Sequence, residues 1–142
     1  MSAKGGKDRT RFDVLILDDD EAVLETTAAI VEEHHDVFAT TRPTEALDKL
    51  RARRFHVVLV DWMMPGMDGV EFFRRASRLD PDVACLIMTG RVNEFTVEVA
   101  RDDRKLLGVI GKPFTPAQLL DRIAQFGGLS KMKKQVRALK AR

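Results

Sequence analysis

The chain contains a single cysteine, no apolar run long enough to span a bilayer, and no apolar core of a secretory signal near its start. Cys85 excludes an internal disulfide, and its place in the apolar run VACLIMT indicates a buried side chain. A membrane-spanning helix needs about 18 apolar residues in succession, and a secretory signal needs an apolar segment. We therefore expect a cytoplasmic protein without a transmembrane segment.

Disorder is excluded by composition, because 44% of the 142 residues are hydrophobic and 32% are charged. This length is typical of one domain. The net charge of +2 conceals a division, since residues 1–11 carry +3, residues 127–142 carry +6 and residues 12–126 carry −7. We expect a flexible basic N-terminus at 1–11, one acidic folded domain at 12–126 and a basic tail at 127–142.

Short apolar runs alternate with helical patterns, which predicts five consecutive βα units. Strands that are apolar throughout are buried on both faces, as in a parallel sheet covered by helices on each side. The predicted strands span residues 14–17, 36–41, 55–61, 83–89 and 106–111. The predicted helices span residues 21–34, 43–53, 69–79, 94–104 and 116–126.

The basic tail begins with Gly127-Gly128, which is typical of a helix C-terminus. Its apolar residues recur at spacings of three, four and three, as in a short basic amphipathic helix. These residues are Leu129, Met132, Val136 and Leu139. Two interpretations stay open: a solvated, frayed terminus, or a stripe that docks on a partner protein, an anionic membrane surface or the acidic body of another copy.

Four of the predicted strands end in residues that can take part in phosphoryl chemistry. These residues are Asp18, Asp19 and Asp20, then Asp61, Thr89 and Lys112. Carboxyl ends of parallel strands share one edge of a sheet, with neighbouring strands about 4.8 Å apart. Crowded carboxylates favour Mg²⁺, and a carboxylate can attack phosphorus to give an acyl phosphate. The lysine and the threonine hydroxyl can contact the transferred oxygens.

The segments LILDDDEAV, VDWMMPGMDG, LIMTG and GKPF, in that order, resemble the signature segments of the bacterial two-component response-regulator receiver domain over residues 12–126. Each motif alone is common, but four in order on the expected strands are specific. The resemblance implies a flavodoxin-like (βα)5 fold, a doubly wound five-stranded parallel sheet flanked by helices. It also implies a phosphohistidine donor on a sensor histidine kinase or phosphotransfer protein.

By matching position, the resemblance implies that Asp61 is the phosphoacceptor. Asp18 and Asp19 correspond to the acidic metal pair, so they would hold Mg²⁺ together with Asp61 and the backbone carbonyl of Met63. No further cofactor is implied. Acids at the start of the first helix satisfy free N–H groups and suit the helix dipole, and Asp20 is expected to have only this capping role.

Thr89 matches the switch hydroxyl of the family. Lys112 matches the phosphate-binding lysine, which precedes a proline with a cis peptide bond in the family. The chain departs from the pattern at Val109, where an aromatic residue usually rotates inward on activation, so the completeness of the switch is open. Met63 and Arg91 occupy positions that tune the phosphoryl lifetime in the family, and we expect an altered lifetime of unassigned direction.

The sequence therefore predicts a stand-alone response regulator that signals through phosphorylation-dependent contacts with a downstream protein or a second copy, and that catalyses only its own phosphorylation and dephosphorylation. One alternative is a receiver-like interaction module that does not respond to phosphate. Another is a haloacid-dehalogenase-type phosphohydrolase with Asp18 as nucleophile and Asp20 as acid and base, although no acidic motif follows Lys112. The absence of a helix-turn-helix pattern argues against DNA binding. His34, His35 and His56 are expected at solvated or boundary positions.

Overall fold

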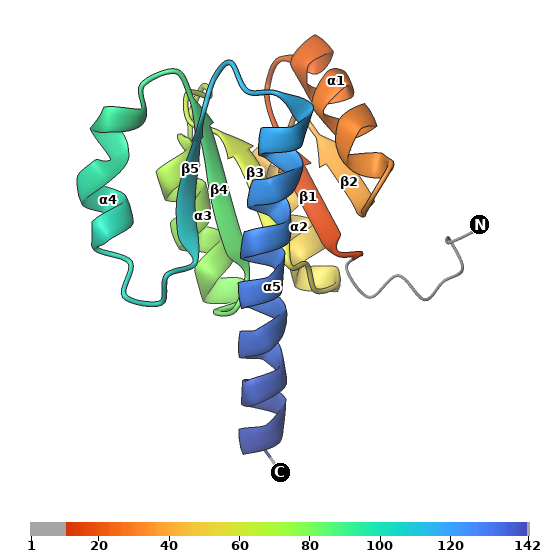
Figure 1. Cartoon of the computed structure of the whole chain (residues 1–142), viewed down its shortest axis with the longest axis vertical. Coiled ribbons are helices and arrows are strands. Elements are labelled where there is room, and N and C mark those ends of the chain that lie inside the picture. Colours follow the sequence, from red (N-terminus) through yellow and green to blue (C-terminus); the bar gives the residue numbers. More distant parts are fainter. Residues whose placement is uncertain (1–10, 142) are drawn as a thin grey trace.

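Strands and helices alternate along the chain in the computed structural model, which describes residues 11–141 (Figure 1). The predicted alternation of strands and helices is confirmed. The elements are β1 (Asp13–Leu17), α1 (Glu21–Glu32), β2 (Asp36–Thr40), α2 (Pro43–Ala52), β3 (Val57–Asp61), α3 (Gly69–Leu79), β4 (Ala84–Thr89), the 3₁₀ turn η1 (Val92–Phe95), α4 (Thr96–Ala100), β5 (Leu107–Gly111) and α5 (Pro116–Lys140).

The five strands form one parallel sheet in the order β2-β1-β3-β4-β5. Helices α1 and α5 cover one face, and α2, α3 and α4 cover the other. Alternate side chains of β1 serve the two faces, since Val14 and Ile16 pack toward α1 and α5 whereas Leu15 and Leu17 pack toward α2 and α3. The expected doubly wound fold is confirmed, and its core lies on both sides of the sheet.

The N-terminus of α1 is built on Asp20. Its carboxylate oxygen Oδ1 accepts hydrogen bonds from the backbone N–H groups of Ala22 and Val23, at 3.1 and 3.2 Å. Such a cap satisfies N–H groups that have no partner within the helix. The expected capping role of Asp20 is confirmed.

The helix predicted at 94–104 is much shorter than expected. The chain forms η1 and α4 and then turns before β5, where Asp102 is 8% exposed. The Oδ2 atom of Asp102 accepts hydrogen bonds from the backbone N–H groups of Leu106 and Leu107, both at 2.6 Å. Lys105 adopts a φ of 62° in this turn, which ends any helical path. Asp102, which lies inside the range predicted as helix, instead holds the start of β5.

The helix end predicted at Gly127-Gly128 is wrong, because α5 continues for 25 residues to Lys140. Gly127 is buried, and a Cβ there would lie 2.5 Å from Cδ2 of Phe12. The glycine therefore allows α5 to approach the ring of Phe12, just before β1, and does not end the helix. The described residues of the tail are helical, as the last turns of α5 and not as a separate short helix.

The second half of α5 is attached to the loop between α3 and β4. Ser130 donates a hydrogen bond from Oγ to the Asp82 carbonyl at 2.6 Å, and Lys134 Nζ lies 2.5 Å from Asp80 Oδ2. Arg137 donates two hydrogen bonds to the Asp82 carboxylate, at 2.6 and 3.1 Å. We call these five residues the α5 anchor. Asp80 and Asp82 are each 4% exposed, so the described tail is fixed to the domain as far as Arg137 and is not frayed.

The predicted flexible N-terminus lies outside the described residues except for Arg11. The Nε atom of Arg11 lies 3.1 Å from Asp36 Oδ1, and its Nη2 donates a hydrogen bond to the His35 carbonyl at 3.2 Å. This contact places the chain beside β2 just before β1 begins. Within residues 11–141, no helix combines the length and apolar character needed to cross a membrane.

Two of the three histidines hold the start of β1. The ring nitrogen Nδ1 of His35 accepts a hydrogen bond from the Phe12 N–H at 3.1 Å, and Nδ1 of His56 accepts one from the Asp13 N–H at 3.0 Å. His34 is exposed. Each accepting nitrogen must carry no proton, so the neutral imidazole fits this arrangement. The expectation of solvated or boundary positions is confirmed for His34 and His56, whereas His35 is buried, at 5% exposure.

The free energy of unfolding should fall as the pH drops below about 6.5, in part because of His56. Burial lowers the pKa of His56 below its ordinary value of 6.5, with Lys134 and Lys131 acting in the same direction and Asp13 and Asp80 opposing. Just below this pH, His56 binds a proton in the unfolded chain but not in the folded chain, so protonation favours unfolding.

Urea denaturation at a series of pH values measures this dependence. His56→Asn keeps an oxygen acceptor for the Asp13 N–H and should flatten the dependence, whereas the exposed control His34→Asn should not. An unchanged slope in His56→Asn would contradict the assignment.

Candidate functional site

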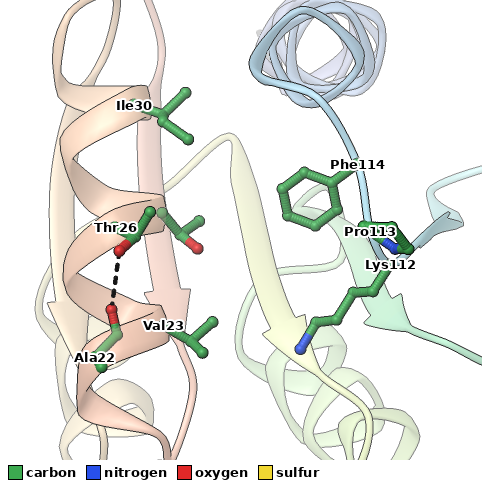
Figure 2. A pocket seen from close by; sticks show the side chains of 8 residues that line it. Ala22, Val23, Thr26, Ile30, Lys112, Pro113 and Phe114 are labelled. Carbon is green, nitrogen blue, oxygen red and sulfur yellow. Dashed lines mark hydrogen bonds between the residues drawn. The ribbon is translucent and has the colours of Figure 1, made fainter.

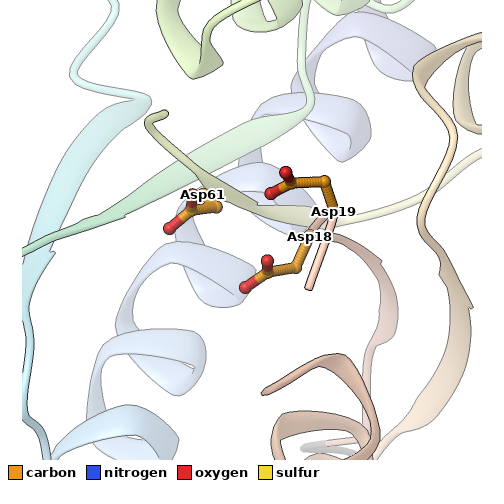
Figure 3. Close-up of side chains that lie close together, drawn as sticks. All are labelled: Asp18, Asp19 and Asp61. Atoms are coloured by element: carbon orange, nitrogen blue, oxygen red, sulfur yellow. The ribbon is translucent and has the colours of Figure 1, made fainter. Parts of the chain in front are cut away.

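Three carboxylates meet at the edge of the sheet formed by the C-terminal ends of the strands. Asp18 and Asp19 follow β1, and Asp61 ends β3. One oxygen from each lies within 4.8 Å of the others, and Figure 3 shows the three side chains side by side. The convergence predicted from the strand ends is therefore present in the structure.

Strand register brings these residues together. Leu17 pairs with Val60 between the parallel strands β1 and β3, which places Asp18 beside Asp61. The N-terminus of α3 packs against the backbone at Asp61, since a Cβ at Gly69 would lie 3.0 Å from the Asp61 carbonyl oxygen. Glycine at this position lets the loop after β3 return tightly over the edge of the sheet.

Asp18 has an unfavourable environment as an isolated carboxylate. It is 2% exposed, its Oδ1 accepts a hydrogen bond from the Asp20 N–H at 2.9 Å, and its buried Oδ2 has no hydrogen-bond partner among the described residues. Burial raises the pKa of Asp18, and the neighbouring Asp61 and Asp19 raise it further against the effects of Asp20 N–H and Lys112. A cation with oxygen ligands would satisfy this orphaned atom and the charges around it.

Lys112 supplies one positive charge to the cluster. It follows β5, and its Nζ lies 2.7 Å from Asp61 Oδ1 and 4.0 Å from Asp18 Oδ2. The backbone N–H of Lys112 donates to the Thr89 carbonyl at 2.8 Å, and its peptide bond to Pro113 is cis, as the family resemblance implied. Three carboxylates and one ammonium group leave a net negative site that suits a divalent cation.

Thr89 ends β4 at the same edge. Asp61 pairs with Met88 in the register of β3 and β4, so Thr89 lies one residue beyond the partner of Asp61. Thr89 is 3% exposed, and its Oγ1 accepts a hydrogen bond from the Arg91 N–H at 2.9 Å. The hydroxyl thus links the site to the loop that leads into η1.

The three positions at which the sequence departs from the family pattern lie in different places relative to this edge. Met63 lies in the loop after β3 and is 64% exposed. Arg91 is exposed and lies 3.8 Å from Glu94. Val109 is partly buried against the apolar cluster under α2, α3 and α4. Met63 and Arg91 therefore stand at the mouth of the site, whereas Val109 belongs to the packing behind it.

A groove of about 620 Å³ extends from Lys112 between α1 and the loop after β5. Figure 2 shows Val23 and Ile30 pointing from α1 toward Phe114 across this space. Its lining is Ala22, Val23, Thr26, Thr27, Ile30, Lys112, Pro113 and Phe114. The sequence predicted a helix over residues 21–34 but gave no sign that one of its faces borders an open groove.

Comparison with known proteins gives a consistent result. A family model described as the response regulator receiver domain matches residues 14–124. A response regulator receiver protein of Anaeromyxobacter sp. is 35% identical over 108 residues, covering 75% of this chain and 45% of that protein. The phosphate regulon transcriptional regulatory protein PhoB of Pseudomonas aeruginosa is 30% identical over 117 residues, covering 78% of this chain and 49% of that protein. The chain spans less than half the length of both relatives.

Solved structures with the same fold include a CheY-like receiver domain protein from Methanospirillum hungatei. It is 28% identical with a TM-score of 0.73, and the match covers 87% of this chain and 98% of that one. A structure described as adenylate cyclase from Rhodopirellula baltica has a TM-score of 0.83 at 21% identity, covering 93% of this chain and 98% of that one. At that identity the second likeness concerns the fold alone.

Proposed function

The chain belongs to the response regulator receiver domain family, and from this premise we propose that Asp61 accepts a phosphoryl group from a phosphohistidine and thereby switches the protein between two signalling states. The donor would be a sensor histidine kinase or a phosphotransfer protein. The observation that carries the proposal is the position of Asp61, which lies within the carboxylate cluster and 2.7 Å from Lys112.

Mg²⁺ is the proposed cofactor. Asp18, Asp19 and Asp61 would hold it together with the backbone carbonyl of Met63, and the orphaned Oδ2 of Asp18 supports this fit. When bound, the ion supplies positive charge that offsets the crowded carboxylates and the incoming phosphoryl oxygens. Few protein ligands and an edge open to solvent suit Mg²⁺, which keeps several of its waters.

Asp61 acts as the nucleophile in this proposal. A bond forms between its carboxylate oxygen and phosphorus as the bond from phosphorus to the donor imidazole nitrogen breaks, and the imidazole keeps the electron pair. The ammonium group of Lys112, now 2.7 Å from Asp61 Oδ1, would contact the phosphoryl oxygens. Attack of water on phosphorus later releases orthophosphate and restores Asp61, so the protein catalyses only its own phosphorylation and dephosphorylation.

Thr89 would transmit the change. A hydrogen bond from its hydroxyl to the phosphoryl group would draw the side chain toward Asp61. The side chain would then move away from the Arg91 N–H, whose hydrogen bond Oγ1 now accepts. The loop leading into η1 would then rearrange and alter the surface around α4, β5 and α5, which a downstream protein or a second copy reads. Because Val109 stands in place of an aromatic residue, the extent of this rearrangement stays a prediction. The altered phosphoryl lifetime expected from Met63 and Arg91 also stays a prediction.

The phosphohydrolase alternative gains nothing from the structure. It needs Asp20 as acid and base, but Asp20 Oδ1 caps α1 through two backbone N–H groups. The phosphate-independent interaction module remains the competing interpretation. We retain the division into a receiver domain at 12–126 and a basic C-terminal segment as an interpretation, with the qualification that α5 crosses the boundary.

Intact-mass measurement of the protein with Mg²⁺ and a small acyl phosphate or phosphoramidate tests the proposal. We expect a mass gain of one phosphoryl group, located by proteolysis in the peptide that contains Asp61, and no gain when a chelator removes the metal. Failure to gain mass, together with no detectable Mg²⁺ binding, would favour the phosphate-independent module.

A further inference from the structure

A second groove, of about 450 Å³, lies beside the last turns of α5 at the edge of the sheet opposite to Asp61. Pro81 and Asp82 precede β4 and Arg104 precedes β5, so the groove borders the N-terminal ends of these strands. Its other wall comes from α5, whose last turns extend past this edge of the sheet in Figure 1. An occupant would leave the carboxylate cluster uncovered.

The α5 wall of the groove is unusually apolar for an exposed helix. Met132, Val136 and Leu139 are 57%, 44% and 63% exposed, and the first two line the groove. Their spacing of four and then three residues puts them on one face of the helix. They account for three of the seven large apolar side chains that are exposed among the described residues. This clustering favours an interaction surface over scattered surface residues.

Basic side chains outnumber the one carboxylate, that of Asp82, among the residues that line the groove. Arg137 already occupies the Asp82 carboxylate, and Arg104 lies 3.1 Å from Asp102. Lys133 and Lys140 also line the groove and form no ion pair with any described residue. Since the nearby carboxylates are engaged, the two lysines give the rim a positive charge that attracts an acidic ligand.

We propose that this groove binds an acidic amphipathic helix of a partner protein. A helical ligand would place its apolar residues on Met132, Val136 and Leu139 and its carboxylates near Lys133 and Lys140. A second copy fits less well, because antiparallel pairing of two α5 helices would bring Lys133 near Lys140 of the other copy. A flat bilayer surface is not complementary to a concave groove. Nucleic acid binds through its phosphates and would leave the apolar stripe without a partner.

Fluorescence anisotropy of the full chain with a labelled synthetic peptide tests this proposal. The probe is a helix-forming peptide with leucines on one face and glutamates flanking them. Its partner control is the same peptide with lysines in place of glutamates. We expect saturable binding of the acidic peptide that weakens at high salt and no binding of the basic peptide.

Variants locate the binding surface. Met132→Ser with Val136→Ser should weaken binding at least about tenfold, as should Lys133→Glu with Lys140→Glu. Met132, Val136 and Lys140 are exposed and Lys133 is partly buried, so circular dichroism should show an unchanged fold. Val97→Ser and Arg51→Glu, which change exposed residues on α4 and α2, should leave the affinity unchanged.

Two further measurements separate other occupants. Sedimentation onto vesicles of anionic lipid, and light scattering for self-association, are repeated with the groove variants. Loss of vesicle binding or of a dimer in those variants, without peptide binding to the wild type, would overturn the proposal. Peptide binding that is indifferent to the variants would overturn it as well.

Discussion

Asp61→Asn should gain no phosphoryl group under conditions that phosphorylate the wild-type protein fully. The amide of asparagine lacks the nucleophilic carboxylate oxygen, and it also removes the charged partner that lies 2.7 Å from Lys112. The fold should persist, because the substitution relieves repulsion among three crowded carboxylates. Intact-mass spectra after incubation with Mg²⁺ and the phosphodonor measure the result.

Other aspartates of the same region provide matched controls. Asp20→Asn should be phosphorylated like the wild type, because the asparagine side chain also caps a helix well. Asp18→Asn should bind Mg²⁺ more weakly and be phosphorylated more slowly, since one proposed ligand is lost. An adduct that persists in Asp61→Asn but disappears in Asp18→Asn would instead favour a nucleophilic Asp18 and the phosphohydrolase interpretation.

Removing residues 130–142 should strongly destabilise the domain, although these residues lie far from the carboxylate cluster. The truncation takes away the Lys134 partner of Asp80 and the two hydrogen bonds from Arg137 to Asp82. Both acids are 4% exposed, and an acid that stays buried without its partner is costly. The loss of the partner of Asp80 alone should lower the free energy of unfolding by about 3 kcal/mol. Urea denaturation measures this change.

A shorter truncation serves as the control. Removing residues 138–142 leaves Ser130, Lys134 and Arg137 in place and should change the free energy of unfolding by less than about 1 kcal/mol. Lys134→Met, which removes the charge but keeps an apolar stem, should reproduce much of the effect of the longer truncation. Equal stability of both truncated chains would show that the α5 anchor contributes little.

The sequence predicted the sheet and the carboxylate cluster well because both depend on local patterns. An apolar run such as 57–60, bounded by turn residues, is typical of a buried strand, and the residue that follows it reaches a known edge once the strands are parallel. Asp18, Asp61, Thr89 and Lys112 could therefore be placed together without knowledge of any contact.

The errors involve contacts that single-residue propensities do not show, two of them between residues distant in sequence and one within a turn. Gly127 has the local character of a helix end, and only the ring of Phe12 shows why a glycine is needed inside α5. Asp102 has the character of a helical surface residue, but its carboxylate binds the N–H groups that open β5. Asp80 looks like an ordinary loop acid until Lys134 is placed 2.5 Å away. Single-residue propensities carry no information about these pairings.

Because α5 is uninterrupted, one helix connects the two opposite edges of the sheet. Thr115 caps its first turn only a few residues after Lys112, and the same helix ends beside the groove that contains Val136. A helix of this length spans about 37 Å, a distance that no single side chain could reach. Because the α5 anchor holds the far part of the helix to the loop between α3 and β4, an adjustment near the carboxylate cluster would be passed along α5 to the anchor contacts at the opposite edge of the molecule.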